Sequence, residues 1–87
     1  MYTLMATVPT IYQYSSLKSL TGVMPSEQPD GSFATAIDFP TREEAIAFML
    51  TRASCLIEDD KELDEACDEI LTYGTMRYDC ATMVLGD

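Results

Sequence analysis

Hydrophobic and polar residues alternate in three segments of this chain, and each alternation predicts a β-strand. The segments cover residues 2–8, 33–39 and 75–85. Pro9 and Pro40 end the first two, because proline cannot donate a hydrogen bond to a neighbouring strand. One face of each strand is formed by Tyr2, Leu4, Ala6 and Val8; by Phe33, Thr35, Ile37 and Phe39; and by Met76, Tyr78, Cys80, Thr82 and Val84, opposite Arg77, Asp79, Ala81, Met83 and Leu85. We expect the first strand to lie at or near the centre of a sheet.

Two further segments have helical periodicity. Thr41-Arg42-Glu43-Glu44 is a capping box, in which the threonine hydroxyl accepts from the Glu44 amide and the Glu44 side chain reaches back to the Thr41 amide. The apolar stripe that follows consists of Ala45, Ile46, Met49, Leu50, Ala53, Leu56 and Ile57, with the spacing of a buried helix face. Glu58-Asp59-Asp60 interrupts this stripe and offers an N-cap for a second helix, which is predicted from about Asp60 to Tyr73, where Gly74 provides a stop.

The segment between the first two strands is less regular. Apolar residues recur every three positions from Ile11 to Leu20, and Gly22 follows, which favours a short helix or a 3₁₀-like turn. A strand continuing through Ile11–Tyr14 fits this pattern almost as well. Residues 24–31 contain two prolines and an Asp-Gly pair, which indicates an exposed loop.

This order of elements, β-(α)-β-α-α-β, predicts an α+β fold: a small, mainly antiparallel sheet of about three strands with two main helices packed on one face. A length of 87 residues suits one compact domain spanning residues 1–87. The hydrophobic fraction of 47% is sufficient for a core, so the charge is expected to lie on the surface.

That charge is strongly negative. The chain has 15 acidic residues against five basic ones, a formal net charge of −10. Such a surface repels phosphate and anionic lipid and attracts partners rich in lysine and arginine over about 8 Å at physiological salt. We therefore expect a basic protein surface as partner, with neither nucleic acid nor a membrane bound directly.

Catalytic and cofactor chemistry has little support. There is no histidine, which excludes Ser-His and Cys-His nucleophiles within the chain, and the four glycines form no nucleotide-binding motif. Asp60, Glu62 and Asp64 alternate like calcium ligands, but Glu65 and Leu71 stand where an EF-hand needs glycine and a bidentate glutamate. We expect no enzymatic activity, no metal site and no cofactor.

The three cysteines, Cys55, Cys67 and Cys80, form no CxxC pair, and we expect all three to be buried as small hydrophobic residues. The N-terminal segment has no basic region followed by a long apolar run, and no segment approaches the roughly 18 apolar residues of a membrane span. These features predict a reducing, cytoplasmic location, which is the host cell cytoplasm if a phage encodes the protein.

The candidate site is the acidic run on the second predicted helix, which contains eight acids in twelve positions. We expect partner contacts from Glu58, Asp59, Asp60, Glu62, Asp64, Glu65, Asp68 and Glu69. Glu58, Glu62, Glu65 and Glu69 form one ridge, with carboxylates about 5 to 6 Å apart, and Asp64 and Asp68 lie beside it. The alternative interpretation is a solvated face that only maintains solubility.

A strongly acidic α+β chain of fewer than ninety residues, with no expected disulfide, resembles the small phage-encoded anti-CRISPR inhibitors. The resemblance lies in size, charge and composition over the whole chain and includes no motif. It implies an inhibitor that binds the basic, nucleic-acid-engaging surface of a CRISPR-Cas effector complex by nucleic-acid mimicry or steric occlusion.

A second hypothesis is a small cytoplasmic adaptor that docks through a tyrosine-bearing strand or a sheet edge, with the acids serving solubility. Tyr12 and Tyr14 are the pair of tyrosines expected to be exposed. The sequence is compatible with a monomer or a homodimer.

Overall fold

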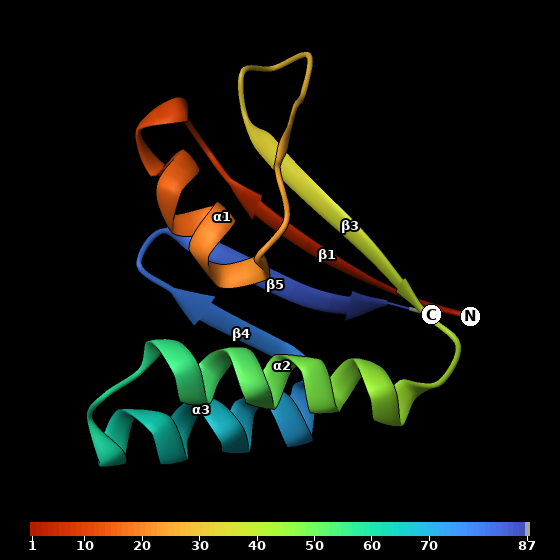
Figure 1. The fold of residues 1–87 in the computed structure, drawn as a ribbon, viewed down its shortest axis with the longest axis vertical. Helices are drawn as coiled ribbons and strands as arrows, with labels where there is room; N and C mark the ends of the chain where they lie inside the picture. The colour runs from red at the N-terminus through yellow and green to blue at the C-terminus, as the bar shows by residue number, and fades with distance from the viewer. Residues whose placement is uncertain (87) are drawn as a thin grey trace.

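Five antiparallel strands and three α-helices make up residues 1–86, the part of the chain that the computed structural model describes (Figure 1). The elements are β1 (Tyr2–Val8), the 3₁₀ helix η1 (Ile11–Gln13), α1 (Tyr14–Thr21), β2 (Ser26–Glu27), β3 (Phe33–Phe39), α2 (Arg42–Leu56), α3 (Asp60–Tyr73), β4 (Thr75–Tyr78) and β5 (Ala81–Gly86). The predicted α+β class is confirmed.

The strands form one sheet in the order β2-β3-β1-β5-β4, with every neighbouring pair antiparallel. The position predicted for β1 is confirmed, since it lies in the middle of the sheet. It pairs with β3 over its whole length, from Tyr2 opposite Phe39 to Val8 opposite Phe33. On its other side Thr3 to Thr7 pair with β5. The ends of the sheet are the two-residue β2 and the four-residue β4.

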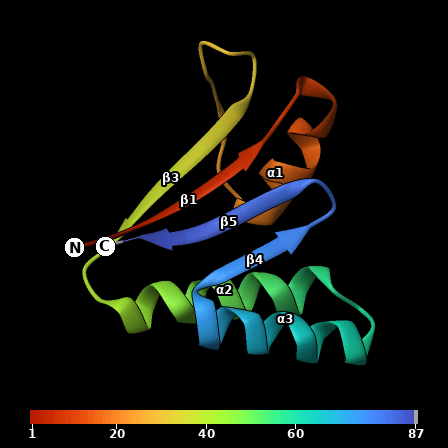
Figure 2. The same cartoon turned by 180° about the vertical axis from the view of Figure 1, so that it is seen from behind.

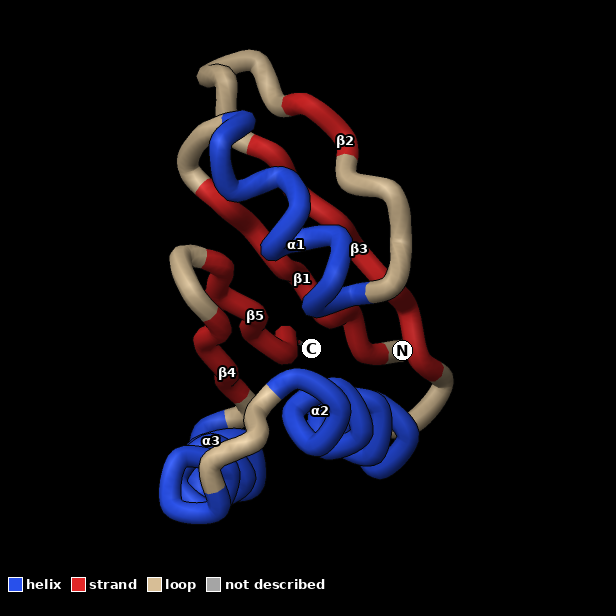
Figure 3. The backbone as a smooth tube through the Cα atoms, turned by 60° about the vertical axis from the view of Figure 1, so that its left-hand side comes forward, coloured by secondary structure: helices blue, strands red, loops and turns tan. Residues whose placement is uncertain are grey.

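The alternation along β1 places Leu4, Ala6 and Val8 in the core, each at most 2% exposed. The helices supply the other half of this core: Leu17 and Leu20 come from α1, Met49 and Ala53 from α2, and Ile70 from α3, all fully buried. The view along the helix pair shows α1 lying over the sheet and α2 beside α3, which adjoins β4 (Figure 3).

The sequence signals for the helix ends are mostly confirmed. The Thr41 hydroxyl accepts from the Glu44 amide at 3.2 Å, and Asp59 caps α3 by accepting from the Glu62 amide at 2.9 Å. The reciprocal bond from the Glu44 side chain is not formed among residues 1–86. Gly74 ends α3 with a left-handed φ of 68°, and its amide bonds to the Ile70 carbonyl.

A basic side chain completes the end of α1, the predicted short helix over residues 10–20. Arg52 of α2 donates from Nε to the Leu20 carbonyl at 2.8 Å and from a terminal nitrogen to the Ser19 carbonyl. These carbonyls have no partner within their own helix, and a cation is favoured at that end of the helix dipole. One of the five basic residues therefore has a structural role.

The predicted count of three strands is wrong in two places. The loop at 24–31 contains β2, which pairs with Ala34 and Phe33, and the predicted strand at 75–85 is a hairpin. Tyr78 faces Ala81 across a two-residue turn, in which Asp79 has a φ of 55°. Cross-strand partners share a face of the sheet, and Met76 is the partner of Met83. The turn therefore places Met76 of β4 on the same buried face as Ala81 and Met83 of β5, whereas a single strand would put them on opposite faces.

The prediction of three buried cysteines is also wrong. All three are free thiols, but Cys55 and Cys80 are exposed and Cys67 is half-buried. Cys80 lies in the hairpin turn, and Cys55 lies on the outer side of α2. Within the described part of the chain, no helix has the length and apolar character needed to cross a membrane.

Two buried threonines provide a matched test of the core. Among residues 1–86 the Thr35 hydroxyl has no hydrogen-bond partner, whereas that of Thr21 bonds to the Leu17 carbonyl at 3.1 Å and the Val23 backbone at 3.2 Å. Valine keeps the shape of threonine and removes the hydroxyl. We expect Thr35→Val to raise the free energy of unfolding by about 1 kcal/mol and Thr21→Val to lower it by about 1 to 2 kcal/mol. Urea denaturation followed by circular dichroism measures both, and equal effects would contradict the assignment.

Candidate functional site

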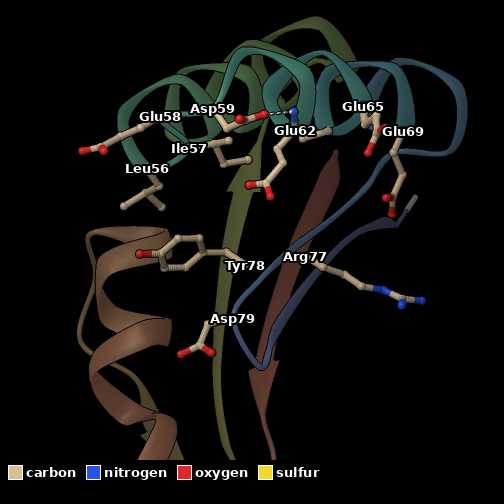
Figure 4. A pocket seen from close by; sticks show the side chains of 11 residues that line it. Leu56, Ile57, Glu58, Asp59, Glu62, Glu65, Glu69, Arg77, Tyr78 and Asp79 are labelled. Carbon is tan, nitrogen blue, oxygen red and sulfur yellow. Dashed lines mark hydrogen bonds between the residues drawn. The ribbon is translucent and has the colours of Figure 1, made fainter.

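The acidic helix α3 forms one wall of a groove of about 860 Å³ (Figure 4). The α2–α3 connection closes one end of the groove, and the β4–β5 hairpin forms the facing wall. The residues that line it are Leu56, Ile57, Glu58, Asp59, Glu62, Glu65, Ala66, Glu69, Arg77, Tyr78 and Asp79. Five of the eight predicted site residues therefore meet at one concave surface.

Three of the six acids in the groove have internal roles. Asp59 caps α3, and Glu69 accepts a hydrogen bond from the Thr75 hydroxyl at 2.5 Å. Asp79, in the hairpin turn, accepts from the Ser16 hydroxyl of α1 at 2.6 Å. These bonds hold the ends of α3, the start of β4 and the tip of the hairpin in place. Substitution of any of the three changes the scaffold as well as the charge.

The other three acids, Glu58, Glu62 and Glu65, accept no side-chain hydrogen bond from the rest of residues 1–86, and all three are exposed. Glu58 lies in the connection before the cap, while Glu62 and Glu65 are one helical turn apart on α3. Figure 4 shows the Glu62 carboxylate directed toward the hairpin, into the groove. These three carboxylates are the ones available to a partner, so we call them the groove triad.

Asp60, Asp64 and Asp68, the remaining predicted site residues, do not line the groove. They are exposed at positions four residues apart, on another side of the same helix, and we call them the outer triad. The structure thus divides the acidic run into a groove set and an outer set. The two triads carry equal charge, which makes the outer triad a control for the groove triad.

The groove has one basic residue, and that residue does not neutralise it. The Arg77 side chain extends away from α3 in Figure 4. No ion pair within 4.0 Å joins an acidic and a basic side chain anywhere in residues 1–86. Acids three or four positions apart on a helix repel each other by a few tenths of a kcal/mol per pair. The repulsion along α3 is therefore left uncompensated within the protein.

Part of the groove lining, near the α2–α3 connection and the hairpin, is apolar. Leu56, Ile57 and Tyr78 are half-buried there, where they pack against the core. A lysine or arginine side chain fits such a surface, because its methylene groups cover apolar area while its charged end remains near carboxylates. The face of a tyrosine ring also attracts an arginine guanidinium. The surface suits a cationic side chain better than a bare ion.

Metal and catalytic chemistry gain no support from this arrangement. Nowhere in residues 1–86 do three cysteine, aspartate or glutamate side chains come together in a way that could hold a metal ion. The pattern of Asp60, Glu62 and Asp64 lies on a regular helix, so Glu62 points to a different side from Asp60 and Asp64.

Sequence reasoning identified the acidic wall of the groove and missed the opposite one. Tyr78 and Asp79 lie at least nine positions after Glu69, and the prediction of a single strand at 75–85 concealed the hairpin that places them. The signal available was the polar Tyr-Asp-Cys interruption, which is weak because it contains neither glycine nor asparagine.

Comparison of the chain with protein-family models, curated proteins and solved structures finds no match.

The two roles of the groove acids predict opposite effects on stability. Glu69→Ala should lower the free energy of unfolding by about 1 kcal/mol, because the Thr75 hydroxyl loses its charged acceptor. Glu65→Ala should leave it unchanged or raise it by a few tenths of a kcal/mol, because repulsion from Glu62 and Glu69 is relieved. Urea denaturation at low salt measures both variants. A larger loss for Glu65→Ala than for Glu69→Ala would contradict this division of roles.

Proposed function

We propose that this protein is an inhibitor that binds a basic, nucleic-acid-engaging surface of a partner protein through the groove and helix α3. The observation that carries this proposal is the groove triad: three exposed carboxylates that accept no side-chain hydrogen bond within residues 1–86 and share the groove with half-buried apolar side chains. Lysine and arginine residues that ordinarily contact phosphates are the matching chemistry. The protein acts by occupying them, so that nucleic acid is excluded.

The charge distribution supports binding over simple solubility. A solvated helix normally mixes positive and negative residues. Helix α3 together with its cap, residues 59–73, contains seven acids and one lysine. Glu62, Glu65 and Glu69 recur along one side of the helix at about 5 to 6 Å, a regular row of negative charges like a nucleic-acid backbone. The outer triad extends the negative field and accelerates association without direct contact.

The resemblance to anti-CRISPR inhibitors supports a CRISPR-Cas effector complex as the partner. Such complexes hold nucleic acid in channels lined by lysine and arginine. A protein of 9.7 kDa with a rigid acidic helix is small enough to enter a channel of that kind. Within this proposal, the protein competes with target DNA or with the recognition of its flanking sequence.

The groove triad gives the direct test. Glu58→Gln/Glu62→Gln/Glu65→Gln should weaken binding to the effector at least about tenfold and restore its binding of target DNA, because the unpaired carboxylates are removed. Asp60→Asn/Asp64→Asn/Asp68→Asn changes the net charge equally, to −7 from −10, and should reduce the association rate with a smaller loss of affinity. Fluorescence anisotropy with labelled target DNA and purified effector complexes measures the competition.

Salt provides a second readout in the same assay. The affinity of the unmodified protein should fall steeply between 50 and 300 mM NaCl, as roughly expected for contacts between exposed charges. Equal losses for the two triads would show that only total charge matters. If the protein binds an effector without changing its affinity for DNA, occlusion is contradicted, and if it binds none of the effectors, the CRISPR assignment is contradicted.

One observation favours the second function, an adaptor that docks through tyrosine. Tyr12 is 90% exposed and its neighbour Ile11 is 64% exposed. Both lie on η1 rather than on a strand, and Tyr14 is half-buried with its ring 5.3 Å from that of Phe33. The expected exposed pair is therefore reduced to Tyr12, and the docking surface of this alternative is η1.

Tyr12→Ala separates the two functions. Under the adaptor function it should weaken partner binding by about 2 kcal/mol, the size typical of an interface hot spot, and neutralisation of the groove triad should have no effect. Under the inhibitor function the effects are reversed. Isothermal titration calorimetry with the same partner measures both variants.

A further inference from the structure

The face of the sheet opposite the helices, which Figure 2 views, has few charged side chains on its strands, and the Glu69 carboxylate of α3 reaches its edge at Thr75. Its outward positions are Thr3, Met5 and Thr7 on β1; Ala34, Ala36 and Asp38 on β3; Thr82, Val84 and Gly86 on β5; and Thr75 and Arg77 on β4. Asp38 and Arg77 are the charged residues among them. On a protein whose net charge is −10, this is a broad surface that a second negative molecule can approach.

The centre of this open face is apolar. Met5 and Val84 are cross-strand partners, and each is 44% exposed. Ala36 lies on the other side of Met5, and a hollow of about 290 Å³ opens beside it, lined in part by Ala34 and Ala36. The uncovered face of an antiparallel sheet is usually polar, whereas an apolar centre with a polar margin is typical of a protein interface.

The two charges lie at opposite corners of this face. Asp38 shares a row with Thr3 and Gly86 at the β3 side, while Arg77 shares a row with Thr82 and Thr7 at the β4 side. From strand and residue spacings, they are separated by about 14 Å across the strands and about 14 Å along them. The midpoint between the corners falls between Met5 and Val84.

We propose that the open face of the sheet is the interface of a homodimer, in which Asp38 of each copy meets Arg77 of the other on either side of Met5 and Val84. A two-fold interface requires a self-complementary patch, and opposite charges at diagonal corners meet that requirement. The two-fold axis that exchanges the two corners lies in the plane of the interface, at about 45° to the strands. The strands of the two copies therefore cross at about 90°, which is one of the two common arrangements of packed sheets.

Both charged groups are available for this contact. Arg77 forms no side-chain hydrogen bond within residues 1–86 and extends away from α3, while Asp38 is exposed and accepts only from the Thr3 hydroxyl, at 2.7 Å. Because Met5 and Val84 are the large apolar side chains at its centre, we expect a weak dimer with a dissociation constant on the order of 10 µM. This inference does not rest on the proposed function: the open face shares Arg77 alone with the groove, and self-association is measured without any partner protein.

Charge exchange between the two corners tests the dimer. At 0.15 M salt the unmodified protein should sediment at twice its chain mass of 9.7 kDa. Asp38→Arg and Arg77→Asp should each weaken self-association at least about tenfold, because like charges then face each other. An equimolar mixture of these two variants should associate again, since each copy supplies the charge that the other lacks.

Matched changes on other surfaces provide the controls. Asp64→Arg and Arg42→Asp alter the charge equally at exposed positions away from the open face and should leave the dimer intact. Val84→Glu places a charge in the apolar centre and should give a monomer even if a corner variant fails to fold. The proposal is overturned if the unmodified protein stays monomeric up to about 1 mM, if the corner variants dimerise normally, or if their mixture does not associate.

Discussion

The inward face of β1, formed by Leu4, Ala6 and Val8, has to be shielded from water, and the rest of the fold is arranged around that requirement. Strands β3 and β5 pair with β1 on both sides, so its backbone groups are satisfied within the sheet. The side chains then need a second layer, which α1, α2 and Ile70 of α3 provide. The helices form this layer on one face of the sheet, and the other face stays open.

Helix α3 combines a structural and an electrostatic role. Ile70 anchors it in the core, Asp59 and Gly74 define its ends, and Glu69 ties it to Thr75. The remaining acids repel one another, a small cost that the core offsets. Because the helix is fixed from its ends and its buried side, the backbone positions of Glu62 and Glu65 in the groove are set by the fold. Such pre-organisation reduces the entropy lost on binding.

Local chemistry predicted much of this structure. The caps at Thr41 and Asp59 and the glycine at 74 located α2 and α3, since each satisfies backbone groups within a few residues. The turn at Asp79 was missed because cysteine follows the aspartate, whereas the usual signal for a two-residue hairpin turn is Asn-Gly or Asp-Gly. That error hid the second wall of the groove. The burial of Cys55 and Cys80 was also misjudged, because exposure depends on the tertiary fold.

We propose that cationic groups bind in the groove and not over the acidic surface in general. An NMR titration of the ¹⁵N-labelled protein with a short oligo-arginine peptide in 0.15 M salt tests it most directly. Our account predicts that amide shifts concentrate at Glu58, Glu62, Glu65 and Tyr78. Equal or larger shifts around Asp60, Asp64 and Asp68, with little change at Tyr78, would contradict it.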